Sequence, residues 1–280
     1  MSNTDADRIT VEIEIPAGRI AIPAEVPHAL IPITALVGPA QRLGEEAHRL
    51  EVQRTLSNGA ALSCREGCAA CCRMLVPVSV PEALALREAI AGWPEERRAR
   101  VAQRLDEARK RLEQAGLLPT LRALADAPSQ VTDEEAEPVN RAYYALRLPC
   151  PFLEEERCSI YEHRPAACRE LLVTSPADLC QDIERNPVRP IEPPLRLSTV
   201  LALLWSHLAG GPARFIPLPL ALEWLDRHAE DGRQTWLATN LFKQLLDHFG
   251  LVLSRELAGR QRGHRPEPSS TLRQPPTSSQ

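Results

Sequence analysis

The first 40 residues carry a strand-like pattern of apolar and polar positions. Between residues 10 and 23, apolar side chains such as Val11, Ile13 and Ile15 alternate with polar ones, and a Pro-Ala-Gly tripeptide interrupts the alternation. A period of two is typical of strands that bury one face, and proline with glycine marks a turn. We therefore expect a small β-hairpin within an N-terminal arm, residues 1–40.

Most of the remaining chain shows a helical spacing of apolar residues. The expected helices run over about 40–58, 81–93, 94–117, 140–148, 198–209, 218–229 and 233–249. The helices over 81–93 and 94–117 both open at a proline, and we expect them to form an antiparallel pair. Ser198 is the expected N-cap of the helix that follows a proline-rich connector. The polar, acidic residues 127–139 predict a loop.

These elements predict a mainly α-helical protein. A loop-rich cysteine core is stapled by metal, and a small N-terminal β-hairpin and a C-terminal helical segment complete it. The expected division is an N-terminal arm with the hairpin over 1–40, a cysteine-cluster metal-binding domain over 41–186 with the inserted helical pair at 81–117, a C-terminal helical segment over 187–258 and a tail over 259–280. The tail lacks apolar periodicity, which predicts disorder.

Composition narrows the classes of partner. The chain has 280 residues and a formal net charge of −4, so its overall charge does not attract nucleic acid or anionic lipid. The apolar run Val200–Trp205 is far shorter than a membrane-spanning helix, and the acidic N-terminus does not resemble a signal peptide. We expect a cytoplasmic protein that binds neither nucleic acid nor membrane, and no protein partner can be read from the chain.

The distinctive chemistry lies in eight cysteines, all between residues 64 and 180. Four lie in the run Cys-Arg-Glu-Gly-Cys-Ala-Ala-Cys-Cys over residues 64–72, and the others are Cys150, Cys158, Cys168 and Cys180. Thiolates this close in sequence can curl around one metal centre, and sulfur ligands favour zinc, iron–sulfur clusters or copper(I). Four disulfides are the alternative, which a reducing compartment disfavours.

The run over residues 64–72 leaves two points open. Its Cys-x3-Cys-x2-Cys spacing is also that of radical S-adenosylmethionine enzymes, but the residues that follow predict helices rather than a βα series. Neighbouring residues of an extended chain point in opposite directions, so Cys71 and Cys72 are not expected to serve one ion equally. The thiols would then form either one four-thiolate site with spare thiols or two such sites.

The later cysteines have informative neighbours. Cys150 begins a Cys-Pro-Phe-Leu segment, and residues 158–169 read Cys-Ser-Ile-Tyr-Glu-His-Arg-Pro-Ala-Ala-Cys-Arg. Together with the leading run, over about 64–172, these motifs resemble the YkgJ-like cysteine-cluster family, the CxxCxxCC proteins described as zinc- or iron-chelating domains. The chain departs from that pattern in having three residues, rather than two, between Cys64 and Cys68.

The resemblance implies metal ligation by the motif cysteines, which are Cys64, Cys68, Cys71, Cys72, Cys150, Cys158 and Cys168. Cys180 lies outside the strongest motif and is an eighth candidate ligand. The cofactor would be an iron–sulfur cluster or zinc, in a structural, redox or sensing role. One branch with this cysteine pattern resembles flagellin lysine N-methylases, so an iron–sulfur-dependent protein lysine N-methylase-like enzyme is an alternative, and a disulfide-stapled interaction protein is a second. No catalytic residue can be assigned.

Two arginines in the trailing motif have a predicted supporting role. Several thiolates around one metal leave net negative charge, and Arg164 and Arg169 are expected to offset it and to donate hydrogen bonds to sulfur. The alternative for Arg169 is a simple pairing with Glu162 or Glu170.

Three further residues of these motifs are candidates for the site. Phe152 and Tyr161 are expected to pack in the core or to cover the site against water. His163 lies among the ligands and is a further candidate ligand through its neutral imidazole.

Overall fold

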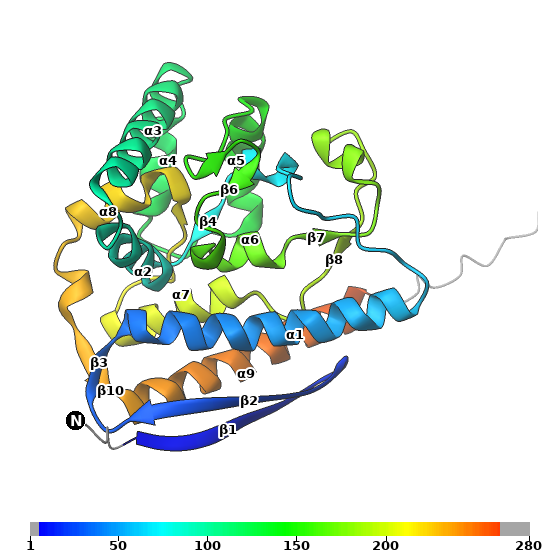
Figure 1. Ribbon diagram of the computed structural model, residues 1–280, viewed down its shortest axis with the longest axis vertical. Helices are drawn as coiled ribbons and strands as arrows, with labels where there is room; N and C mark the ends of the chain where they lie inside the picture. The colour runs from blue at the N-terminus through cyan, green and yellow to red at the C-terminus, as the bar shows by residue number, and fades with distance from the viewer. Residues whose placement is uncertain (1–5, 264–280) are drawn as a thin grey trace, which may run out of the picture.

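The computed structural model describes residues 6–263, and within them the chain is mainly helical, as the sequence predicted (Figure 1). The N-terminal hairpin is confirmed. Strands β1 (Ala6–Ile15) and β2 (Gly18–Pro27) pair antiparallel across a two-residue turn. Both strands extend beyond the predicted 10–23, because Arg8 pairs with Glu25 across the open end of the ribbon and Val26 is buried there in the main core.

The hairpin lies against a layer of long helices (Figure 1). Strand β2 contacts α1 (Val37–Ser57) and α9 (Ala238–Gly263), and α9 packs on α7 (Leu197–Ala209). Helix α7 also contacts α2 (Val80–Ala91), so it lies at the centre of the helical layer. One apolar core joins these elements, and its members include Ile20, Leu36, Leu84, Leu201 and Phe249.

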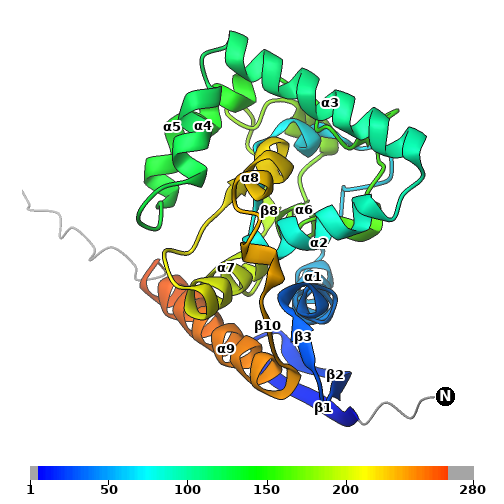
Figure 2. The ribbon, with the colours of Figure 1, turned by 90° about the vertical axis from the view of Figure 1, so that its left-hand side faces the viewer.

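A second group of helices stands at the far end from the hairpin (Figure 2). It contains α3 (Glu95–Gln114), α4 (Leu118–Ala125), α5 (Asp133–Ala145) and α8 (Ala221–Arg227). Helix α4 contacts both α3 and α5, and α8 contacts α2. A smaller apolar core within this group includes Leu112, Leu121, Tyr143, Leu148 and Leu220.

Short strand pairs and turns connect the helices. The pairs are β3 (Leu30–Pro32) with β10 (Thr235–Leu237), β4 (Pro77–Val78) with β9 (Ile216–Pro217), β5 (Leu153–Glu154) with β6 (Arg157–Cys158), and β7 (Leu172–Val173) with β8 (Pro190–Ile191). Single turns of helix are η1 (Ile33–Leu36), η2 (Ala70–Arg73), η3 (Tyr161–His163), η4 (Ala177–Gln181), η5 (Leu218–Leu220) and η6 (Asp231–Arg233), and α6 (Ala166–Glu170) is nearly as short. Pieces of two to five residues carry no readable periodicity, so the sequence did not predict them.

The predicted loop over 127–139 is wrong. Helix α5 begins at Asp133, because Thr132 and Glu135 form a capping box that satisfies the first backbone N–H groups. The acidic residues that made this stretch look like a loop also suit the positive end of a helix dipole.

Two predictions about the C-terminal helices are also wrong. Arg196, and not Ser198, is the N-cap of α7, and Ser198 is buried inside the helix. Helix α9 begins at Ala238 instead of residue 233, because residues 235–237 form strand β10. It continues to Gly263, past the predicted start of a disordered tail at 259, and the rest of that tail lies outside the described residues.

The predicted antiparallel pairing of the second and third helices is wrong. Helix α2 packs against α7 and α8, whereas α3 packs against η5 and α4. The reason lies in their apolar surfaces. Helix α2 is buried along most of its length, whereas α3 has only the narrow stripe of Val101, Leu105, Ala108 and Leu112. None of the helices within residues 6–263 is long and apolar enough to cross a membrane.

Candidate metal centre

The eight cysteines lie in loops, turns and short elements outside the long helices, and the turns η2 and η4 that carry three of them contact each other. Cys64 and Cys68 follow α1, and Cys71 and Cys72 lie in η2. Cys150 precedes β5, and the last three occupy β6, α6 and η4, as Cys158, Cys168 and Cys180. In Figure 1 the cyan segment after α1 passes beside the green segment that holds β6 and α6.

Backbone hydrogen bonds anchor the loop that carries the first cysteines. The N–H of Ser63 donates to the carbonyl oxygen of Val173 at 3.0 Å, which fixes the loop to β7. The N–H of Cys68 donates to the carbonyl oxygen of Arg65 at 3.0 Å. This turn contains Gly67 at φ +80°, a left-handed conformation that suits glycine.

The two cysteine sets meet directly through their backbones. The N–H of Cys150 donates to the carbonyl oxygen of Cys72 at 2.8 Å. Next to this link, Arg73 donates to both carboxylate oxygens of Glu156, at 2.7 and 3.1 Å. Arg73 also lies close enough to the sulfur of Cys72 to interact with it electrostatically. The sequence reasoning missed Arg73, although its place directly after the cysteine run could have drawn attention to it.

A buried carboxylate positions the short helix that carries Cys168. One oxygen of Glu82 accepts the backbone N–H of Ala166, the first residue of α6, at 2.6 Å. Its other oxygen accepts the N–H of Ser79 at 3.0 Å and the hydroxyl of Ser79 at 2.6 Å. Glu82 therefore caps the N-termini of α2 and α6 together. The Ser-x-x-Glu capping box was readable from the sequence, but the contact with Ala166 was not.

Burial dominates the electrostatics of most of the thiols. It raises the pKa of Cys150 to about 12 from an ordinary value of 9.0. Burial also raises the pKa of Cys168, and the neighbouring thiols of Cys150, Cys71 and Cys158 raise it further. The pKa of Cys180 is raised by its own partial burial and then by Cys64, Cys68 and Cys71. The thiols of both sets thus lie within each other's electric fields.

Cys71 and Cys72 do not point in opposite directions as predicted. They lie in a 3-10 turn, whose three-residue period differs from that of an extended chain. The Cys72 thiol donates a hydrogen bond to the sulfur of Cys71, which lowers the pKa of Cys71 to about 7 and raises the pKa of Cys72. Cys71 is therefore the thiol most easily ionised near neutral pH.

Backbone amides of three segments donate to cysteine sulfurs. The N–H of Phe152 donates to Cys150, and the N–H of Ile160 donates to Cys158. In the first set, the N–H of Val173 donates to Cys64. In each case the hydrogen bond opposes the effect of burial on the thiol pKa, because it stabilises the anionic sulfur. Amide donors of this kind are what thiolate ligands of a metal use to spread their charge.

Arg164 is the cation most closely associated with the thiols. Burial raises the pKa of Cys158 and of Cys168, and the positive charge of Arg164 opposes that rise in both. The same charge acts on Cys71 in addition to the Cys72 hydrogen bond. Its guanidinium stacks 3.7 Å from the ring centroid of Tyr161. These interactions are consistent with the role predicted for Arg164, which stays a prediction.

Arg169 holds the motif loop to the helical layer. It pairs with the carboxylate of Glu45 on α1 and donates to the carbonyl oxygens of Glu162 at 2.6 Å and Arg164 at 2.9 Å. Its main ion pair is therefore not with Glu162 or Glu170, the two partners considered from the sequence. Glu162 offers only its backbone, and the carboxylate of Glu170 accepts the N–H of Leu197 at 2.8 Å. The charge of Arg169 also favours the thiolate of Cys158, after burial and Arg164.

The two aromatic residues of the motif have different environments. Phe152 is 1% exposed and belongs to the main apolar core. Tyr161 is 58% exposed, so the prediction that it packs in the core is wrong, and its role in covering the site stays a prediction. His163 is exposed as well.

The sulfur donors suit a soft metal ion, although the thiols are not already arranged around one ion. All eight cysteines are free thiols of intermediate exposure. Within the described residues, no group of three or more Cys, His, Asp or Glu side chains is already arranged to hold one ion. Each cysteine side chain turns about a single torsion, and the segments that carry them are short loops. The fold therefore brings the sulfur donors near one another. Rotations of the cysteine side chains would have to complete a metal site.

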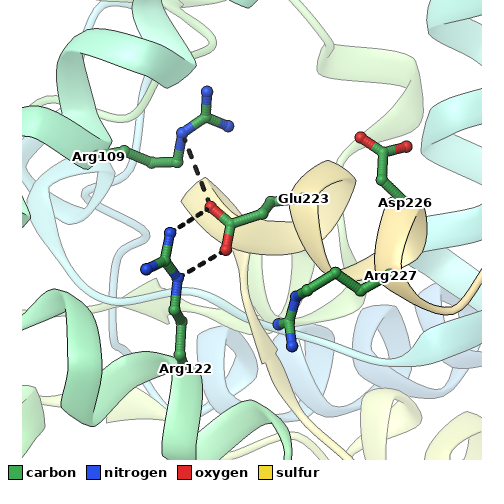
Figure 3. Close-up of a pocket in the computed structure, with 5 residues that line it drawn as sticks. All are labelled: Arg109, Arg122, Glu223, Asp226 and Arg227. Carbon is green, nitrogen blue, oxygen red and sulfur yellow. Dashed lines mark hydrogen bonds and ion pairs between the residues drawn. The ribbon is translucent and has the colours of Figure 1, made fainter.

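A separate surface depression of about 580 Å³ lies on α3, α4 and α8 (Figure 3). Its lining residues are Arg109, Arg122, Glu223, Asp226 and Arg227. Arg122 donates to both oxygens of Glu223, at 2.7 and 3.1 Å, and Arg109 lies 3.8 Å from the same carboxylate. Substrate pockets are typically concave and largely apolar. This open network of ion pairs contains no cysteine and is separate from the thiols.

Comparison with known protein families agrees with this site. Residues 63–184 match the family model CxxCxxCC, whose description is "Putative zinc- or iron-chelating domain". The predicted resemblance to the CxxCxxCC proteins is therefore confirmed, and the matched segment contains all eight cysteines. No curated protein and no solved structure matches the chain.

Proposed function

We propose that the chain binds metal through its cysteine thiolates, as an iron–sulfur cluster or zinc, in a structural, redox or sensing role. The observation that carries this proposal is the convergence of eight free thiols from both cysteine sets into one electrostatically coupled group. Amide donors to sulfur and the charge of Arg164 add support, because both stabilise thiolates. Free thiols also suit the reducing cytoplasm, where we expect the protein to act.

Within this function, the thiols are proposed to serve two centres. Cys180 interacts electrostatically with Cys64, Cys68 and Cys71. In a second group, Cys168 interacts with Cys150 and Cys158, and Cys72 interacts with Cys150 and Cys168. Each group then offers four sulfurs, with Cys71 completing the first, although its charge also acts directly on Cys150, Cys158 and Cys168 of the second. All-sulfur ligation by four thiolates suits iron–sulfur clusters and structural zinc alike, and the excess of sulfur favours the clusters.

Metal analysis after anaerobic purification tests the proposal. We expect about two metal centres per chain, with the broad visible absorption of iron–sulfur clusters. A colourless protein with stoichiometric zinc would show that the bound metal is zinc and not an iron–sulfur cluster. A metal-free protein, reproducibly so under reducing conditions, would overturn metal binding altogether.

The variant Cys180→Ser tests the number of centres. Under the two-centre proposal it empties one centre and leaves the other, so metal content falls by about half. Ser63→Ala, in the same region of the fold but without a thiol, is the matched control and should keep full content. An unchanged metal content in Cys180→Ser would contradict the assignment of Cys180.

A further inference from the structure

The N-terminal hairpin presents one unprotected strand edge. Within residues 6–263, β1 pairs with β2 alone, and β2 is the strand that contacts α1 and α9. Figures 1 and 2 show β1 on the outer side of the hairpin, at the boundary of the molecule. A ten-residue strand with a free edge offers a row of unpaired N–H and C=O groups to another strand.

The register identifies which groups face that edge. Ile15 and Gly18 close a two-residue turn and so exchange backbone hydrogen bonds. Hydrogen-bonded and non-hydrogen-bonded pairs alternate along an antiparallel ladder, so the even-numbered residues of β1 direct their N–H and C=O groups outward. Thr10 is central among them and lies opposite Pro23 of β2.

The two edges of the hairpin are chemically different. In β2 the outward positions include Pro23 and Pro27, which have no N–H and close that edge to further pairing. Strand β1 contains no proline, and it is rich in the β-branched residues that favour strands. Ile9 of β1 is 40% exposed, which is high for an isoleucine. Only the β1 edge is therefore able to accept another strand.

We propose that β1 pairs antiparallel with β1 of a second copy of this chain, about a two-fold axis at Val11, to form a continuous four-stranded sheet. This register places Arg8 opposite Glu14 of the second copy. Within one chain Arg8 already pairs with Glu25 at 2.9 Å, and Glu14 lies 3.7 Å from Arg19. The row across the four strands would thus alternate in charge.

The apolar face of the strand is continuous in the same register. Ile9 would lie opposite Ile13 of the second copy, and Val11 opposite its own counterpart. Val11 and Ile13 already pack against the main core, so the centre of this face, from residue 9 to residue 13 of each copy, is apolar across the new junction. Cross-strand pairs of β-branched residues and of opposite charges both stabilise a sheet.

Sedimentation and light scattering of the full, metal-loaded chain over a concentration series test the proposal. We expect the mass to rise from the monomer value of 31.0 kDa toward that of a dimer. Thr10→Pro removes the central outward N–H without removing a β1–β2 hydrogen bond, and should weaken association by roughly tenfold or more. Thr10→Ala, which keeps the N–H, is the matched control and should associate normally. A monomer at all concentrations, or a dimer unaffected by Thr10→Pro, would overturn the proposal.

Charge exchange tests the register independently of the proline variant. Arg8→Glu places two acidic pairs across the junction and should weaken the dimer about tenfold. Adding Glu14→Arg should restore association, whereas adding Glu12→Arg should not, because residue 12 faces Thr10 in this register. Rescue by Glu12→Arg instead of Glu14→Arg, or no effect of Arg8→Glu, would overturn the two-fold axis at Val11. Circular dichroism of every variant should match that of the unaltered chain.

Discussion

The backbone N–H of Cys150 donates a 2.8 Å hydrogen bond to the carbonyl oxygen of Cys72, and this bond joins the two cysteine sets directly. The link does not depend on any sulfur atom. The ion pair of Arg73 with Glu156 reinforces it from the neighbouring residue. The two sets are therefore held together by the fold, and loss of one thiol should affect metal binding more than it affects the polypeptide.

The first prediction concerns single cysteines of the two sets. Cys68→Ser and Cys168→Ser should each lose at least one metal centre, because a hydroxyl is a poor ligand for soft metals. Cys64→Ser and Cys150→Ser should behave alike. Elemental analysis measures the loss, and circular dichroism should show that the helices remain. Full metal content in Cys68→Ser would contradict the convergence of the two sets on shared metal.

The second prediction concerns pH. Metal binding to protonated thiols releases protons, so affinity should fall as pH falls. In the metal-free protein, the stability of the fold should instead fall as pH rises. The pKa of Cys150 is raised to about 12, so its burial contributes stability that is present below the ordinary value of 9.0 and is lost as pH rises toward 12.

Urea unfolding of reduced, metal-free protein measures this second effect. Between about pH 8 and pH 10, Cys150 alone should cost about 1 kcal/mol of unfolding free energy. Cys150→Ala should remove that part of the pH dependence. If the metal-free protein were equally stable at both pH values, burial in the fold would not raise the pKa of Cys150.

The third prediction concerns Arg164. Arg164→Gln removes a positive charge that favours the thiolates of Cys71, Cys158 and Cys168, so metal binding should require higher pH. We expect the pH midpoint of metal binding to rise by about half a unit to one unit. Arg164→Lys keeps the charge and should restore most of the shift.

Arg157→Gln is the control for the Arg164 variants. Arg157 lies in β6 next to Cys158 but pairs at 3.4 Å with the exposed Glu66. Its replacement should leave the pH midpoint unchanged. Equal shifts in the Arg157 and Arg164 variants would mean that overall charge, and not the position of Arg164, determines the effect.

The fourth prediction concerns Glu82. Glu82→Ala would leave the N–H of Ala166 and the N–H of Ser79 without their buried acceptor, at a cost of about 3 kcal/mol in unfolding free energy. Because α6 carries Cys168, metal affinity should fall as well. Glu82→Gln keeps one acceptor oxygen and should cost less. Glu88→Ala, at an exposed position of the same helix, should have little effect on either measurement.

The fifth prediction concerns metal removal. The loops over 59–69 and 174–189 are mostly outside the apolar cores, so ligation should contribute much of their order. A chelator should therefore expose Arg65 and Arg185 to trypsin while Arg111 in α3 stays protected and most of the helical circular dichroism remains. Loss of all helical signal together with the metal would show that the helical segments do not fold independently. Unchanged cleavage after complete metal removal would show that ligation does not order these loops.

Local patterns in the sequence were sufficient for the hairpin, for most of the long helices and for the cysteine motifs. The alternation at Val11, Ile13 and Ile15 is a property of adjacent residues, and so is the spacing of the cysteines over 64–72. Capping signals are local too, and the capping box at Thr132 and Glu135 could have revealed α5. The acidic composition of that stretch obscured it.

The internal arrangement of the site depended on contacts between residues far apart in the chain. No local pattern indicates that Glu82 accepts the N–H of Ala166, or that Arg169 pairs with Glu45. The direction of the Cys71 and Cys72 thiols depended on a 3-10 turn that is too short to be read from periodicity. The sequence by itself determined which residues carry the chemistry, because thiol identity and spacing are local. Only the tertiary structure decided which thiols, amides and charges meet, because that depends on how α1, α2 and α6 pack around one core.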